Sequence, residues 1–257
     1  MSPEARQTLA GWVGRDLATQ ELRDMVGAPS GARVWVEPSA FTAGAVDFYL
    51  LGAPVPVERY VPGADISERM HMELGMIQMP VFGGDSVGRA SRTLARGADG
   101  RLEMHNDVFR VLPEYQGRGI GVRVFAKEVK TLAGLRDAQG QQLVSRIGAL
   151  MAGHRRSSDQ GYYVWPLMGY NTRPGALRYY YREMVRDKSV SSGERARVRK
   201  LGANLTVQDL YQSAEGRAWW RQHGIAEAGT FDLTPGSRSL QILHAYLTQK
   251  GIAWDTL

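Results

Sequence analysis

Apolar residues recur along this chain at two different spacings, and each spacing predicts a type of secondary structure. Over residues 5–26 they recur at roughly helical spacing, and Gly27 is placed to end that helix. Between Leu102 and Val111 apolar and polar residues alternate, as expected of a strand. Helical spacing returns over residues 119–134, where the apolar positions are Val122, Val124, Phe125, Val129 and Leu132.

Shorter patterns predict the remaining elements. Strands are expected at residues 33–36, 46–51, 91–96, 143–152 and 229–233, with one long strand and a glycine irregularity at 70–79. Asp99-Gly100 signals a β-hairpin between 91–96 and 102–111. Helices are expected over 173–186, 206–223 and 237–250, with Thr206 and Asp209 as a capping box. The order strand 102–111, helix, strand 143–152 implies a parallel pair of strands.

A glycine-rich turn, Gln116-Gly117-Arg118-Gly119-Ile120-Gly121, joins the strand at 102–111 to the following helix. Gly117 and Gly119 permit a positive φ or the close approach of a ligand to the backbone. Gly121 suits close packing of the first helical turn on the strand. Such a turn directs several backbone N–H groups to one place, beside the partial positive charge of a helix N-terminus, and therefore predicts a phosphate site. Most glycine turns bind nothing, but the strand before this one and the helix after it strengthen the prediction.

These residues resemble the GNAT superfamily of N-acyltransferases. The turn at 116–121 fits that family's Q/R-x-x-G-x-G/A loop, which holds the pyrophosphate of acyl-CoA, and Val111-Leu112-Pro113-Glu114-Tyr115 is similar to the V-x-P-x-Y/F approach to it. The spacing differs from the dinucleotide-binding fingerprint, and the G-K-[ST] of a P-loop is missing. The resemblance extends over about residues 30–170, and more weakly over 228–234.

The resemblance implies an α/β fold in which helices flank a mixed, mostly antiparallel sheet with a parallel splay. We expect a single domain over residues 1–257, with a GNAT-like core at 30–171. A helical segment at 1–29 would precede the core. A basic helical insertion at 172–227 would interrupt it before the last strand and C-terminal helix, at 228–257.

The implied activity is transfer of an acyl group from acyl-CoA, with acetyl-CoA the favoured donor, to a primary amine of a small molecule or peptide. In that family the amine attacks the thioester directly in a ternary complex, without a metal. Pantetheine would pair with backbone like an added strand beside residues 102–111. The implied CoA contacts are Phe109, Val111, Gln116, Gly117, Arg118, Gly119, Ile120 and Gly121.

The base that deprotonates the amine is expected among Glu103, His105 and Asp107, which alternate onto one face of the strand. Histidine is suited to proton transfer near neutrality, and Asp107 could orient it or act through water. The alternative is that these charges form solvated cross-strand pairs on an exposed sheet face.

Residues 161–170 carry a second point of resemblance, to a helix ending A-x-x-x-Y-x-x-x-G-F in many members of the family. Met168-Gly169-Tyr170 looks like its end, but Trp165 stands where the frequent catalytic Tyr is found. An indole N–H only donates hydrogen bonds, so a proton for the departing CoA thiolate would come from Tyr162, Tyr163 or water. This departure favours an alternative, a non-catalytic module that binds acyl-CoA or a partner.

The amino-acid composition further limits the classes of site and of protein that are possible. With 257 residues, 43% hydrophobic and 23% charged, the chain is typical of soluble globular proteins. The lack of cysteine excludes disulfides, thiolate metal sites and cysteine nucleophiles, and the five scattered histidines show no metal-binding spacing. No apolar run is long enough to span a membrane and no signal-peptide pattern opens the chain, so we expect a cytoplasmic protein with no membrane partner.

The net charge of +6 belongs to one segment. Residues 173–200 hold nine basic and three acidic residues, and the rest of the chain balances. The segment also contains Tyr179-Tyr180-Tyr181. It is interpreted first as a solvated helix face, then as a surface that recognises an acidic or phosphorylated substrate, and last as a nucleic-acid surface. The sequence leaves open whether the protein forms an oligomer.

Overall fold

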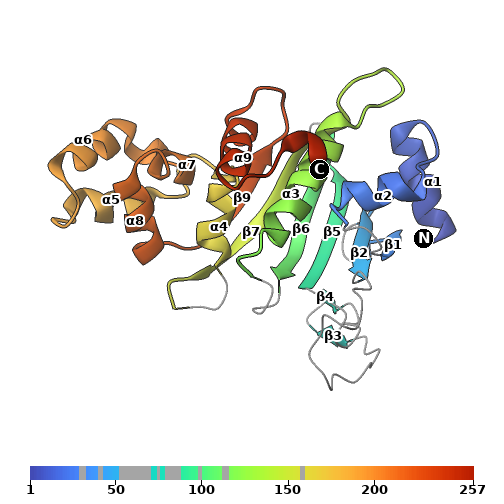
Figure 1. Ribbon diagram of the computed structural model, residues 1–257, viewed down its shortest axis with the longest axis horizontal. Coiled ribbons are helices and arrows are strands. Elements are labelled where there is room, and N and C mark those ends of the chain that lie inside the picture. Colours follow the sequence, from blue (N-terminus) through green and yellow to red (C-terminus); the bar gives the residue numbers. More distant parts are fainter. Residues whose placement is uncertain are drawn as a thin grey trace. The chain divides into compact units, whose positions relative to one another are not determined.

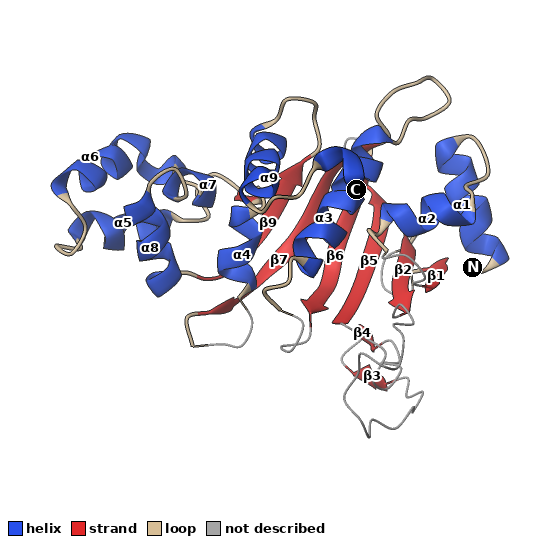
Figure 2. Cartoon of the chain, viewed as in Figure 1, coloured by secondary structure: helices blue, strands red, loops and turns tan. Residues whose placement is uncertain are grey.

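The computed structural model describes residues 1–28, 33–39, 43–51, 71–73, 76–78, 88–97, 100–111, 116–156 and 160–257. The chain forms two compact units. Figures 1 and 2 show their helices and strands. The first comprises Met1–Arg146 with Lys250–Leu257, and the second comprises Ile147–Gln249. Among the described residues, no helix combines the length and apolar character that crossing a bilayer requires.

The first unit contains a sheet in which β1 (Arg33–Pro38), β2 (Val46–Leu51), β5 (Gly88–Arg96) and β6 (Leu102–Val111) are neighbours in that order, and each pair is antiparallel. A separate ribbon consists of β3 (His71–Glu73) and β4 (Met76–Gln78). The helical elements are α1 (Pro3–Val13), α2 (Thr19–Met25), α3 (Ile120–Gly134) and the short 3-10 turn η4 (Trp254–Thr256).

The core of this unit lies between α3 and one face of the sheet. Leu102 and Met104 of β6 are fully buried, whereas the next residue, His105, is exposed on the opposite face. The buried positions of α3 include Phe125 and Val129, and α3 packs on β6 and on α2 (Figure 1). The predicted strand at 102–111, the predicted helix at 119–134 and the hairpin between β5 and β6 are confirmed.

The prediction of one helix over residues 5–26 is wrong, because α1 ends at Val13 and α2 begins at Thr19. Gly14 adopts a left-handed conformation with φ 76°, and its N–H donates to the carbonyl of Ala10 at 2.8 Å. This glycine cap stops the helix although apolar residues continue at roughly helical spacing. The long strand predicted at 70–79 is also wrong: β3 and β4 pair with each other, with His71 opposite Gln78.

The second unit contains most of β7 (Val144–His154), whose first three residues belong to the first unit, together with β9 (Ile225–Asp232) and β8 (Asn171–Thr172), in the strand order β7, β9, β8. β8 and β9 are antiparallel. The helices are α4 (Gly161–Leu167), α5 (Arg178–Arg186), α6 (Ser192–Leu201), the 3-10 turn η3 (Gly202–Asn204), α7 (Val207–Leu210), α8 (Ala214–His223) and α9 (Arg238–Gln249).

Two predicted helices of this unit have different limits. The helix expected over 173–186 begins at Arg178, because Gly175 has a φ of 87° in the preceding turn. The helix expected over 206–223 is divided into α7 and α8. The predicted capping box is confirmed, since the Asp209 carboxylate accepts from the Thr206 N–H at 3.0 Å. A second cap starts α8, where the Ser213 hydroxyl accepts from the Gly216 N–H at 2.8 Å.

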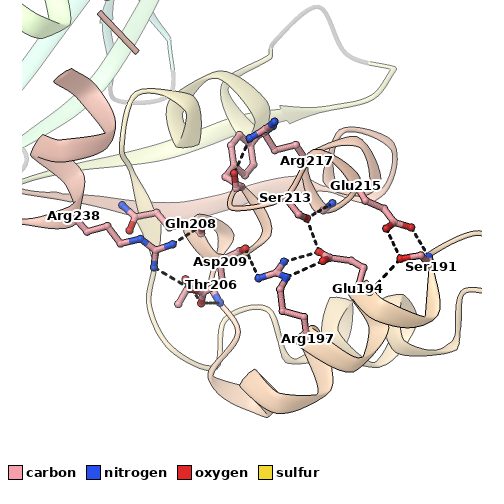
Figure 3. A network of polar contacts seen from close by, with 12 residues as sticks. Ser191, Glu194, Arg197, Thr206, Gln208, Asp209, Ser213, Glu215, Arg217 and Arg238 are labelled. Carbon is pink, nitrogen blue, oxygen red and sulfur yellow. Dashed lines mark hydrogen bonds and ion pairs between the residues drawn. The ribbon is translucent and has the colours of Figure 1, made fainter. Parts of the chain in front are cut away.

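A polar network connects α6, α7 and α8 (Figure 3). Arg197 donates to both carboxylate oxygens of Glu194, at 2.8 and 2.5 Å, and to the carbonyl of Asp209 at 3.0 Å. Glu194 also accepts from the Ser213 hydroxyl at 2.6 Å. This pairing lowers the pKa of Glu194, mainly through the hydrogen bonds from Arg197. The basic stretch after Ser189 is therefore a structured helix that uses part of its charge internally.

Candidate functional site

The strand β6 carries an irregularity beside the predicted catalytic residues. Ser91 pairs with Val108 and Arg92 pairs with Asn106, so Asp107 is an extra residue with no partner on β5. Such a β-bulge bends a strand and redirects the side chains that follow it. Bulges are over-represented next to active sites, which makes this part of β6 a candidate site on structural grounds.

Phe109 and Val111, which follow the bulge, face α3, whereas His105 before it faces solvent. Beyond it, Phe109 and Val111 lie against the first turn of α3: a Cβ built on Gly121 would be 3.4 Å from Phe109 Cε1 and 3.7 Å from Val111 Cγ2. The Arg92 guanidinium lies 5.2 Å from the centre of the Phe109 ring. Strict alternation would instead have put both residues on the face of His105. Their predicted role as CoA contacts remains a prediction.

A chain of hydrogen bonds runs along the exposed face at the bulge. His105 Nδ1 lies 2.8 Å from Asp107 Oδ1, and the Thr93 hydroxyl donates to Asp107 Oδ2 at 2.8 Å. The side chains of His105 and Asp107 are 52% and 33% exposed, so both are accessible to a reactant. When Nδ1 carries the proton that Asp107 accepts, Nε2 is left with a lone pair. The arrangement can therefore accept a proton at Nε2 and stabilise the imidazolium that forms.

Glu103, the third predicted candidate on this face, is engaged differently. It forms an ion pair with Arg146, and its side chain is 27% exposed. The structure thus brings His105 and Asp107 together and gives Glu103 a cationic partner. Because Glu103 is already occupied by Arg146, the geometry favours the His105–Asp107 pair.

The glycine-rich turn leads from β6 into α3 with the geometry that the sequence indicates. Gly117 and Gly119 have φ values of 75° and 76°, and Gly119 is the N-cap of α3. A Cβ on Gly117 would meet nothing within 4 Å, so positive φ rather than crowding explains that glycine. The Gln116 side-chain amide donates to the carbonyl of Val111 at 2.9 Å, which ties the turn to the strand end. Leu112–Tyr115, part of the predicted motif, lie outside the described residues.

The start of α3 offers hydrogen-bond donors to an anion. Among the described residues, no side chain caps this end of the helix. The N–H groups of a first helical turn have no acceptor within the helix, and they carry the positive end of the helix dipole. Gly119 and Ile120 are half-buried, whereas Arg118 is exposed. The turn can therefore bind a phosphate or pyrophosphate through its backbone.

A buried polar group lies beneath the bulge, and sequence reasoning missed it. Arg92 Nε donates to Glu128 Oε1 at 3.1 Å, and Asn106 Nδ2 donates to Glu128 Oε2 at 3.4 Å. All three side chains are buried, with Arg92 and Glu128 at 1% and 0% exposure. Burial raises the pKa of the Glu128 carboxyl, and the charge of Arg92 opposes that rise. The group connects β5, β6 and α3 at the point where the strand bulges.

Tyr162 and Tyr163, the predicted proton donors, belong to α4 of the second unit. The Tyr162 hydroxyl donates to the carbonyl of Arg221 at 2.8 Å, and its side chain is 1% exposed. Burial raises the pKa of Tyr162, against a smaller opposing effect of Arg221. The ring of Tyr163 lies 5.2 Å from the Arg221 guanidinium, and its carbonyl accepts from the Tyr211 hydroxyl at 2.7 Å. Both tyrosines are thus integrated into an aromatic cluster, and their acid role remains a prediction.

Trp165 occupies a core position in the same unit. Its ring centre lies 4.8 Å from that of Tyr170, whose ring lies 5.8 Å from Phe231. Gly161 also has a packing role, because a Cβ there would come within 2.7 Å of the carbonyl oxygen of Ala152. These contacts explain the residue types at both positions without reference to catalysis.

A cavity of about 570 Å³ lies near the C-terminal end of α3. Its basic side chains have partners within the protein. Arg15 pairs with Glu21 at 2.5 Å, and Lys127 pairs with Asp24 at 2.7 Å. Lys130 donates to the carbonyls of residues 254, 255 and 257. Because these charges are satisfied, the start of α3 is the better anion site. Within the described ranges, no group of three His, Asp or Glu side chains is arranged to hold a metal ion.

Comparisons with known proteins add little to this geometry. No protein-family model matches the sequence, and no curated protein matches it. Among solved structures, the chain is similar to Arabidopsis thaliana Naa50 in complex with the bisubstrate analogue CoA-Ac-MVNAL, with 15% sequence identity and a TM-score of 0.25. The match covers 36% of this chain and 58% of the Naa50 chain. At this TM-score the similarity does not establish a common fold, so the candidate site rests on its own residues.

Proposed function

We propose that the protein is an acyl-CoA-dependent N-acyltransferase, with acetyl-CoA as the favoured donor and a primary amine of a small molecule or peptide as the acceptor. One observation carries the proposal: the uncapped start of α3 follows directly on the strand that presents the His105–Asp107 pair. An anion site and a base on consecutive elements are what transfer from a pyrophosphate-bearing thioester requires. The sequence motif at 116–121 supplies the same interpretation independently.

In the proposed reaction, the backbone of residues 117–121 binds the CoA pyrophosphate and the thioester lies along β6. Nε2 of His105 accepts a proton from the acceptor ammonium, and Asp107 stabilises the resulting imidazolium. The neutral amine attacks the thioester carbonyl, so a C–N bond forms as the C–S bond breaks and CoA leaves as a thiolate. The proton that the nitrogen loses on becoming an amide passes through water to this thiolate, since the hydroxyl of Tyr162 already donates to a backbone carbonyl.

Turnover with a panel of amines tests the proposal. We expect the purified protein to release free CoA from acetyl-CoA faster in the presence of at least one small amine or peptide N-terminus, detected with a thiol reagent. The acylated amine should appear in equal amount by mass spectrometry. Binding of acyl-CoA without any amine-dependent thiol release would instead support the non-catalytic acyl-CoA-binding module, which Trp165 at the position of the frequent catalytic Tyr favours.

A further inference from the structure

Helix α5 presents a row of arginines on one side. Arg178, Arg182 and Arg186 are four residues apart, so each lies about 40° around the helix from the last and about 6 Å further along it. All three are exposed, whereas Tyr180 and Met184 on the opposite side are buried. The helix therefore packs within the second unit through one face and leaves on the other a basic row that turns through about 80°.

Within the described part of the chain, the charge of this row has no acidic partner. None of the three guanidinium groups forms an ion pair with any described residue. Neighbouring arginines behave differently. Arg197 pairs with Glu194 in the network of Figure 3, and Arg195 donates to the carbonyl of Asp187 at 3.2 Å. Arg195 and Arg197 of α6 are thus held by partners within the segment, whereas the three arginines of α5 form no ion pair with a described residue.

An exposed aromatic ring borders the same row. Tyr179 lies about 100° from Arg178 around the helix, and its side chain is 66% exposed. Its ring centre is 5.4 Å from that of Tyr180 in an edge-to-face arrangement, and Tyr180 in turn packs 5.1 Å from Trp220. A ring held against a buried cluster loses little conformational entropy on binding. Such aromatic and arginine side chains are the types that dominate binding energy at interfaces.

We propose that this row, Arg178, Arg182 and Arg186 with Tyr179, binds an acidic peptide segment in an extended conformation. Alternate side chains of an extended peptide repeat every 6.6–6.8 Å or so, close to the step of about 6 Å between the arginines. Carboxylates at alternate positions would therefore each meet one guanidinium group. The row is narrow, because exposed Glu183 borders it. A nucleic acid, whose binding commonly neutralises about 6–10 phosphates, would need a wider basic surface.

The test uses two labelled peptides of equal composition and charge, measured by fluorescence anisotropy at low salt with the full chain. One carries three glutamates at alternate positions among serines, and the other carries them consecutively. We expect the alternating peptide to bind at least threefold more tightly, and Arg182→Gln to weaken its binding about fivefold or more. Arg6→Gln, which removes an exposed arginine from α1 of the first unit, is the matched control and should change nothing.

Three outcomes would overturn the inference. Equal affinity for the two peptides would mean that spacing is not recognised. Equal weakening by Arg6→Gln and Arg182→Gln would indicate attraction by net charge alone. Tighter binding of duplex DNA, with a salt dependence near −0.9 per neutralised phosphate, would identify a nucleic-acid surface instead. Circular dichroism of each variant checks folding, and Tyr179→Ser gives a second variant that leaves the charge unchanged and should also weaken peptide binding.

Discussion

Replacing Arg92 by methionine is expected to lower the free energy of unfolding by about 3–5 kcal/mol, the usual cost of leaving one buried charge without its partner. The reason is that Glu128 is fully buried and Arg92 Nε lies 3.1 Å from its carboxylate. Methionine keeps the apolar part of the arginine volume but removes the positive charge. Urea denaturation followed by circular dichroism measures the loss.

The charge of Glu128 provides the control for this prediction. The double variant Arg92→Met with Glu128→Gln removes both charges and should recover more than half of the lost stability. In the single variant, the pKa of Glu128 should rise further, because the variant lacks Arg92, whose charge opposes the effect of burial in the unmodified protein. A carboxyl whose pKa is raised in the folded state stabilises that state at low pH, where it is protonated. This contribution to the free energy of unfolding is lost as pH rises. The deficit should therefore be smaller at pH 5 than at pH 8, and an equal deficit would contradict the account.

Substituting His105 by asparagine should lower kcat/KM for acyl transfer by a factor of about 10²–10⁴, the usual contribution of a positioned general base. The prediction rests on the hydrogen bond between His105 Nδ1 and Asp107, which leaves Nε2 to accept the proton of the amine. Because asparagine cannot take up that proton, the variant should also lose the acidic limb of the pH profile. Initial rates of thiol release over a pH series measure both effects.

Two further substitutions test whether His105 and Asp107 act as a general base or only form part of a polar surface. Asp107→Asn keeps the size of the side chain but weakens its support for the imidazolium, so kcat should fall while CoA affinity stays the same. Glu103→Gln alters the charge of the same face at a residue already paired with Arg146 and should have little effect on the rate. If Glu103→Gln slows the reaction more than His105→Asn, the base has been assigned to the wrong residue.

Strand β6 and helix α3 could be predicted from the sequence because each buries one face, and burial imposes a period on its own residues. The helix break at Gly14 was missed for the same reason, since apolar residues continue at similar spacing on both sides of the turn. Only the glycine itself signalled the end. The division of 206–223 had a comparable local signal in Ser213, which caps α8.

The bulge at Asp107 left only a weak signal in β6. Apolar residues stand at even positions as far as Val108 and at odd positions from Phe109, but the extra residue is defined only relative to the pairing partners on β5. This explains why Phe109 and Val111 lie toward α3 rather than with His105. The buried group of Arg92, Asn106 and Glu128 is also tertiary, although its signal was present: Glu128 lies three residues after Phe125 and four before Leu132, on the buried stripe of α3.

The turn before α3 was the most predictable part of the candidate site. Positive φ at Gly117 and Gly119 follows from the steric freedom of glycine, and a following amphipathic helix follows from its own period. The ligand, in contrast, is not determined by these features, because many anions bind to helix N-termini. The identity of CoA therefore requires a binding measurement.

Calorimetric titration of CoA into the protein and into two variants of Gly119 tests the central claim most directly. Asparagine and aspartate both tolerate the left-handed conformation of this residue, where φ is 76°, and they differ mainly in charge. We expect CoA to bind the unmodified protein at one site and Gly119→Asp to bind it at least tenfold more weakly, a loss of about 1.4 kcal/mol. Gly119→Asn should retain most of the affinity. Absence of CoA binding to the unmodified protein, or equal affinities of folded Gly119→Asp and the unmodified protein, would contradict the claim that the start of α3 holds the pyrophosphate.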